Sequence, residues 1–150
     1  MKQALIAARA RALETSNFDA LLQLIPYARF LGVSVEIHDG QLRSVLAPSE
    51  HLIGSPRLPA LHGGVTAAFM ENAALLHLLM QPDLVRIPKS IDFSLDYLRP
   101  ARLQTSYAQC EVTRAGARAA QVQIRCWQSS PAEPIAIGRG HFLLLSSKAE

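Results

Sequence analysis

The chain has 150 residues, of which 49% are hydrophobic, and a formal net charge of +3 at pH 7. This length and apolar content predict a single domain, residues 1–150, with a hydrophobic core of its own. No stretch approaches the roughly 18 uncharged apolar residues that cross a bilayer, and the arginines are scattered without interleaved aromatic residues, which argues against membrane insertion and nucleic-acid binding.

Two helices are predicted at the N-terminus, over residues 2–13 and 18–24. The first run contains two arginines, which a secretory signal tolerates poorly, so we expect a helix that the mature protein keeps. Pro26 is expected to end the second helix. Residues 1–25 are therefore interpreted as a helical extension that packs against the outside of the core.

A β-hairpin and a loop are predicted next. Residues 33–37 and 42–47 are strand-like and flank Asp39 and Gly40, and an Asp-Gly pair is a strong signal for a tight hairpin turn. Residues 51–60 contain one glycine and two prolines, which predicts a loop.

The most apolar helix of the chain is predicted over residues 65–80, and the Gln81-Pro82 pair is expected to end it. Apolar residues lie on nearly every side of this segment. A helix of that kind, about 24 Å long, belongs in the interior of a protein.

Four strands are predicted after the long helix, over residues 90–98, 104–114, 118–127 and 135–145. Period-two alternation gives two of them a buried face, formed in the first by Ile91, Phe93, Leu95 and Tyr97 and in the third by Val122, Ile124 and Cys126. The order of elements predicts an α+β fold, with an antiparallel sheet wrapped around one long central helix.

The first candidate site is the turn that precedes this helix, at His62, Gly63 and Gly64. Glycines let the backbone approach a ligand closely, and a helix N-terminus offers free N–H donors that polarise a carbonyl and stabilise an oxyanion. Gly64 N–H is the donor we expect. The alternative is that the glycines only allow a tight turn.

The second candidate is the polar pair Glu71 and Asn72 in the middle of the apolar helix. A buried carboxylate is costly unless it is paired or faces a cavity, and desolvation raises its basicity towards that of a general base or nucleophile. A structural salt bridge or an interface contact is the alternative.

The cysteines and histidines do not form a recognisable metal site. Cys110 and Cys126 are isolated thiols without CxxC spacing, so neither a disulfide framework nor a thiolate zinc site is expected. The sequence predicts no metal, no cofactor and a cytoplasmic location.

The segment LHGGVTAAFMENAALL resembles the signature of the hotdog-fold acyl-CoA thioesterases, in the branch that includes the phenylacetate-pathway proteins. The resemblance implies homodimers or homotetramers with active sites at the subunit interface. It implies that Gly64 donates to the thioester carbonyl, that His62 holds the loop, and that Glu71 is nucleophile or general base. It also places Gly63 and Asn72 among the substrate-binding residues.

The segment from Lys89 to Pro100 resembles the strand that follows the helix in this family, where a residue at the place of Ser90 orients the attacking water. Ser55 stands where many relatives carry an asparagine. Arg99 is expected to bind substrate, and the candidates for contacts with the coenzyme A phosphates are Arg99, Arg102, Arg114 and Arg118.

The function predicted on this basis is hydrolysis of acyl-CoA thioesters to free acid and coenzyme A. One alternative keeps the fold but makes the protein a non-catalytic acyl-CoA or lipid-binding module, because fold does not fix function. Dehydration of a hydroxyacyl thioester is a third reading, but it would need a histidine base with a carboxylate partner near the substrate carbon.

Overall fold

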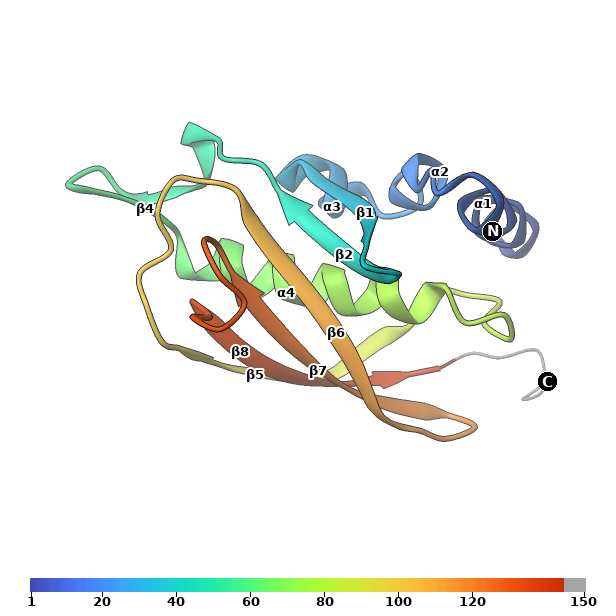
Figure 1. Cartoon of the computed structure of the whole chain (residues 1–150). Coiled ribbons are helices and arrows are strands. Elements are labelled where there is room, and N and C mark those ends of the chain that lie inside the picture. The colour runs from blue at the N-terminus through green and yellow to red at the C-terminus, as the bar shows by residue number, and fades with distance from the viewer. Residues whose placement is uncertain (145–150) are drawn as a thin grey trace.

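A computed structural model describes residues 1–144 of the chain (Figure 1). No helix in this range is long and apolar enough to span a bilayer. The elements, in chain order, are α1 (Lys2–Thr15), α2 (Asp19–Leu22), α3 (Pro26–Leu31), β1 (Val33–His38), β2 (Gln41–Leu46), the 3-10 helix η1 (Glu50–Leu52), β3 (Ile53–Ser55), β4 (Leu58–Leu61), α4 (Gly63–Leu79), β5 (Lys89–Tyr97), β6 (Ser106–Ala115), β7 (Ala119–Trp127) and β8 (Ala136–Leu143).

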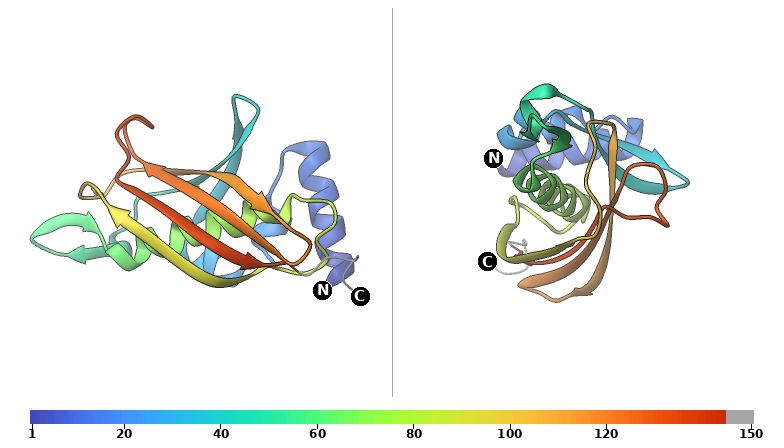
Figure 2. Two further views of the ribbon diagram at one scale, coloured as in Figure 1. Left: turned by 90° about the horizontal axis from the view of Figure 1, so that it is seen from below. Right: turned by 90° about the vertical axis from the view of Figure 1, so that its left-hand side faces the viewer.

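The main sheet has six strands in the order β1-β2-β6-β7-β8-β5, and every neighbouring pair is antiparallel. It curves across one side of α4, as the view from below and the end-on view show (Figure 2). The predicted sheet around one central helix is therefore confirmed. Strands β1 and β5 form its two edges.

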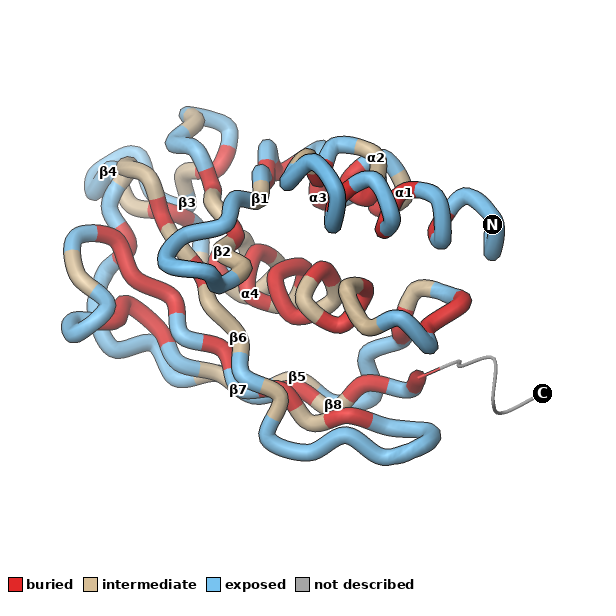
Figure 3. The backbone as a smooth tube through the Cα atoms, turned by 45° about the vertical axis from the view of Figure 1, so that its right-hand side comes forward, coloured by how far each residue is buried: buried red, intermediate tan, exposed pale blue. Residues whose placement is uncertain are grey.

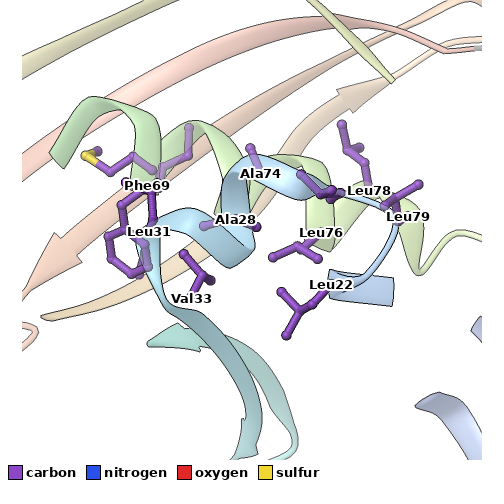
Figure 4. Close-up of a cluster of buried hydrophobic side chains, with 14 of the residues drawn as sticks. Leu22, Ala28, Leu31, Val33, Phe69, Ala74, Leu76, Leu78 and Leu79 are labelled. Carbon is purple, nitrogen blue, oxygen red and sulfur yellow. The ribbon is translucent and has the colours of Figure 1, made fainter. Parts of the chain in front are cut away.

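Helix α4 lies between two layers because it is apolar nearly all round. It packs against β2, β6, β7 and β8 on one side and against α3 on the other. Burial runs along α4 and the facing sides of α1 to α3, while the β1–β2 and β6–β7 turns are exposed (Figure 3). The cluster between α4 and the preceding segments is shown in Figure 4 and includes Leu22, Ala28, Leu31, Val33, Phe69, Leu76 and Leu79.

The β1–β2 hairpin has the turn that the sequence predicts. His38 pairs with Gln41, and the two residues between them have positive φ, 50° at Asp39 and 74° at Gly40. Positive φ at both central positions defines the turn that matches the twist of two-residue hairpins.

Two predictions about the connecting segments are wrong. Pro26 does not end a helix but occupies the first position of α3, where a missing N–H costs nothing. The helical region consequently continues to Leu31 and contributes to the core. Residues 51–60 are not only a loop, since β3 and β4 form a short hairpin that projects beside the N-terminal end of α4 (Figure 1).

The N-terminal helix is joined to the far end of α4 by a buried arginine. The Arg9 guanidinium donates to the carbonyls of Leu79, Gln81, Pro82 and Leu84, at 3.3, 2.8, 2.8 and 2.8 Å. These carbonyls lie at and just beyond the C-terminus of α4, where acceptors lack helical partners and a positive charge is stabilised.

Strand β5 departs from the predicted alternation. Ser90 pairs with Phe142 and Asp92 with His141 of β8, so Ile91 is the extra residue of a β-bulge. Ile91 is 62% exposed and Tyr97 is 56% exposed, whereas the sequence predicts that both are buried. Phe93 and Leu95 pack against the core, and so do the predicted residues of β7, Val122, Ile124 and Cys126. Leu145, at the end of the last predicted strand, lies outside the described residues.

Candidate functional site

The N-terminal turn of α4 is capped by the residue that precedes it. His62 has an extended backbone (φ −61°, ψ 135°), and its Nδ1 accepts a hydrogen bond from Gly64 N–H at 2.9 Å. The N–H groups of Val65 and Thr66 donate to the His62 carbonyl, at 2.9 and 3.2 Å. Gly63 N–H has no hydrogen-bond partner among residues 1–144. The free donor at the positive end of the helix is thus Gly63 N–H, while the expected donor, Gly64 N–H, is engaged by His62.

The β3–β4 hairpin supports this turn from behind. A Cβ atom at Gly54 would lie 2.7 Å from His62 Cα, so only glycine permits the observed approach of β3 to the turn. His62 N–H donates to the carbonyl of Leu52 at 2.9 Å. Ser55 follows Gly54 at the exposed end of β3. Ser55 therefore adjoins the glycine that contacts the turn, but the turn is supported by the backbone of this hairpin and not by the Ser55 side chain.

A pocket of about 330 Å³ opens beside the same turn. Tyr97, at the end of β5, donates from its hydroxyl to the Gly63 carbonyl at 2.7 Å. Arg99 also lines the pocket, but its guanidinium donates to the Pro134 carbonyl at 2.7 Å. The remaining lining residues are Ala60, Leu61, Gly63, Thr66, Leu98, Pro100, Ala101 and Ile135.

Glu71 and Ser90 are brought together from α4 and β5. Glu71 is half-buried, and its Oε1 accepts a hydrogen bond from the Ser90 hydroxyl. Strict alternation along β5 would put Ser90 on the face opposite Phe93 and Leu95, away from α4. The bulge at Ile91 reverses this and turns Ser90 towards the helix. A carboxylate with a neighbouring hydroxyl can orient and deprotonate a water molecule.

Asn72 lies next to Glu71 in the sequence but is held differently. Its side chain is 4% exposed, and Nδ2 donates to the Ala68 carbonyl at 2.8 Å within the helix. Oδ1 is buried and has no partner among the described residues. Asn72 does not line the pocket beside Gly63.

Burial shifts the pKa of three other side chains, two thiols and one imidazole. Burial raises the pKa of the Cys126 thiol to about 12, and burial together with the nearby Cys126 raises that of Cys110 further. Burial lowers the pKa of His77, so its imidazole is neutral at pH 7. In the described part of the chain, no three His, Cys, Asp or Glu residues are grouped so that they could hold a metal ion.

The two candidate chemical groups of one chain are far apart. Gly63 and Glu71 are eight residues apart in α4, which is about 12 Å at the helical rise of about 1.5 Å per residue. A donor and a base acting on one carbonyl must each lie within roughly 3–3.5 Å of the reacting atoms. This backbone separation exceeds the reach of one glutamate side chain, so the Glu71 carboxylate does not contact the glycine turn of its own chain.

Tyr97 is the site residue that the sequence does not identify. Its place in an apolar alternation favours core packing, but its ring is exposed and its hydroxyl binds the glycine turn. The one signal in the sequence that could have pointed to this role is the residue type, because the hydroxyl of a packed tyrosine usually forms a hydrogen bond.

Comparison with known proteins gives consistent matches. Residues 58–135 match the thioesterase superfamily. A Chromobacterium violaceum protein of known structure is 40% identical, with 95% of this chain and 97% of that chain covered and a TM-score of 0.73. Two further structures share the fold, a phenylacetic acid degradation-related protein from Ralstonia eutropha (16% identity, 91% and 98% covered, TM-score 0.74) and a Bacillus halodurans protein solved with CoA (19%, 97% and 93%, 0.70). No curated protein matches the chain in sequence.

Proposed function

Because the chain belongs to the thioesterase superfamily and has its hotdog fold, we propose that it hydrolyses acyl-CoA thioesters to free acid and coenzyme A. Superfamily membership supports thioester hydrolysis in general. The choice of acyl-CoA rests on the sequence resemblance and on the fold shared with the Bacillus halodurans protein solved with CoA.

The observation that carries the proposal is the pair formed by Glu71 and Ser90. Glu71 is the one carboxylate of the largely apolar helix α4, and the bulge in β5 brings a hydroxyl to it. In the proposed reaction Glu71 removes a proton from water, which attacks the thioester carbonyl, while Ser90 orients the carboxylate and the water. Direct attack by Glu71, giving a mixed anhydride that water then hydrolyses, uses the same groups.

The amide of the glycine turn supplies the second function. As the carbonyl is attacked, its oxygen becomes an oxyanion, and a free N–H at the positive end of a helix stabilises that charge. We assign this role to Gly63 N–H, because Gly64 N–H is already bound by His62. The tetrahedral intermediate then collapses, the C–S bond breaks, and the thiolate leaves with the proton from Glu71.

The separation of Gly63 and Glu71 along α4 supports a site built from two copies of the chain. We propose a homodimer, alone or within a tetramer, in which Gly63 of one copy and Glu71 of the other act on one carbonyl. The free edge of the sheet at β5 suits such an assembly, since an edge strand offers unpaired N–H and C=O groups. The exposed apolar side chains of Ile91 and Leu98, on and beside β5, would be covered.

Thiol release from a panel of aryl, short-chain and long-chain acyl-CoA esters tests the function. We expect turnover by the wild type and a loss of roughly 10²–10⁴-fold in kcat for Glu71→Gln. Glu111→Gln is the matched control, because Glu111 is an exposed carboxylate on β6. Stoichiometric acyl-CoA binding without thiol release would instead identify a binding protein, and full activity of Glu71→Gln would refute the role of Glu71.

A further inference from the structure

One peptide group in the glycine turn is held at both ends by side chains. The N–H of the Gly63–Gly64 peptide donates to His62 Nδ1 at 2.9 Å, and its carbonyl accepts from the Tyr97 hydroxyl at 2.7 Å. The two side chains come from different elements, one from the residue before α4 and one from the end of β5. Together they restrict the rotation of this peptide plane.

This restraint matters because glycine, which lacks a Cβ atom, limits backbone rotation less than any other residue. The unpartnered N–H belongs to the adjoining His62–Gly63 peptide, whose carbonyl accepts from the N–H groups of Val65 and Thr66. Because the two peptides meet at the Gly63 Cα, holding the Gly63–Gly64 peptide limits the remaining rotation of the one that carries the free N–H. A donor stabilises an oxyanion best when it is already aimed at the place where the charge develops. The restraint therefore acts on the group to which we assign oxyanion stabilisation.

We propose that Tyr97 is a positioning residue for the amide donor, an inference that rests on the proposed function. The Tyr97 hydroxyl fixes the carbonyl of the peptide that follows Gly63 and thereby orients Gly63 N–H towards the thioester carbonyl. Tyr97 does not touch the reacting atoms in this assignment. Its effect passes through the backbone of Gly63.

Tyr97 is itself held firmly enough to act in this way. Its backbone pairs with Ala136 of β8, and the next two N–H groups, of Leu98 and Arg99, both donate to the Ile135 carbonyl, at 2.8 and 3.2 Å. The residue as a whole, by contrast, is 56% exposed, so core packing does not explain the placement of its side chain.

The absence of a side chain at Gly63 is part of the same arrangement. A Cβ atom at Gly63 would lie 3.1 Å from the Tyr97 hydroxyl oxygen and 3.3 Å from Cζ, closer than ordinary contacts. Glycine therefore allows the tyrosine to reach the carbonyl without displacement.

The kinetic test is Tyr97→Phe, which removes only the hydroxyl. We expect kcat for benzoyl-CoA to fall by about threefold to tenfold, as the loss of one hydrogen bond predicts, with KM changed less than about twofold. Tyr27→Phe is the matched control, because Tyr27 is also exposed and its ring stacks on Phe30 in α3. A kcat unchanged in Tyr97→Phe, or lowered equally in Tyr27→Phe, overturns the proposal.

A spectroscopic test separates positioning from a merely structural role. Benzoyl-CoA labelled with ¹³C at the thioester carbonyl is bound to Glu71→Gln and to Glu71→Gln/Tyr97→Phe, and its carbonyl stretch is recorded by isotope-edited infrared spectroscopy. We expect a lower frequency with the hydroxyl present, because an aimed donor polarises the carbonyl. Equal frequencies overturn the proposal.

Hydrogen exchange of the Gly64 amide, which is hydrogen-bonded to His62, followed by NMR in the protein without substrate, keeps the inference separate from the proposed function. We expect faster exchange in Tyr97→Phe than in the wild type, and unchanged exchange overturns the restraint. Absence of thioester hydrolysis by the wild type would refute the proposed function and with it the purpose assigned to Tyr97. Normal hydrolysis with unchanged exchange would refute Tyr97 alone.

Discussion

Replacing Gly63 by proline removes the N–H group to which we assign oxyanion stabilisation and adds a ring in its place. Gly63 is the first residue of α4, the helical position that proline favours, and its φ is not positive. His62 before it has ψ of 135°, within the range that a following proline requires. Gly63→Pro should therefore fold, so that its activity reports on the missing donor.

The magnitude follows from the two changes that the substitution makes. Loss of one oxyanion donor lowers kcat by roughly 10²–10³-fold. The added Cβ would also meet the Tyr97 hydroxyl at 3.1 Å, a contact that a small shift of the exposed ring relieves. Gly63→Ala introduces the same Cβ but keeps the N–H. The ratio of kcat between the two variants should thus report on the exchange of the donor for the rest of the proline ring, with the Cβ contact cancelled.

The assay is thiol release from benzoyl-CoA, with circular dichroism to confirm that both variants are folded. We expect Gly63→Ala to keep activity within about tenfold of the wild type and Gly63→Pro to fall about a further hundredfold. Equal kcat for the two variants would refute the assignment of Gly63. A large loss in Gly64→Pro alone would return the role to Gly64, with His62 displaced by the substrate.

Three further outcomes are expected. Ser90→Ala should lower kcat by about tenfold to a hundredfold with little change in KM, because the Glu71 carboxylate loses the hydroxyl that orients it. Thiol release measures both constants, and an unchanged kcat would exclude an orienting role for Ser90. Arg9→Ala should lower the free energy of unfolding, measured by urea titration, by roughly 3 kcal/mol, because buried carbonyls lose a charged hydrogen-bond donor. Arg11 is exposed, so the free energy of unfolding of Arg11→Ala should stay within about 0.5 kcal/mol of the wild-type value. Arg99→Gln should raise KM for acyl-CoA but not for the corresponding acyl-pantetheine, which lacks the nucleotide phosphates, whereas Arg11→Gln on α1 should change neither. Equal effects of the two variants would point to general charge attraction.

Much of the fold follows from the sequence because its signals are strong and local. Residues 65–80 are apolar on nearly every side, which favours an interior position for the helix, and the structure places α4 there. Asp39 and Gly40 specify the turn between β1 and β2. The alternation in β7 predicts which side chains face the helix, and they do.

The remaining features depend on contacts between distant segments. The bulge at Ile91 is fixed by pairing with β8, and alternation within β5 alone gives no sign that it turns Ser90 towards Glu71. Pro26 is compatible with the end of one helix and with the start of the next. Among site residues, Gly64 is indistinguishable from Gly63 until the His62 side chain is located.

Mixed oligomers test whether Gly63 and Glu71 of different copies form one site. Oligomers of Gly63→Pro or of Glu71→Gln lack every functional site. A heterodimer of the two variants has one site with intact Gly63 and intact Glu71 if the groups come from different copies, and none if they come from the same copy. Differently tagged variants, co-expressed and purified through both tags, should show about half of the wild-type activity per dimer. Activity no higher than that of the single variants would mean that Gly63 and Glu71 of the same copy act on one substrate carbonyl. That result would contradict the inference drawn from their separation of about 12 Å along α4.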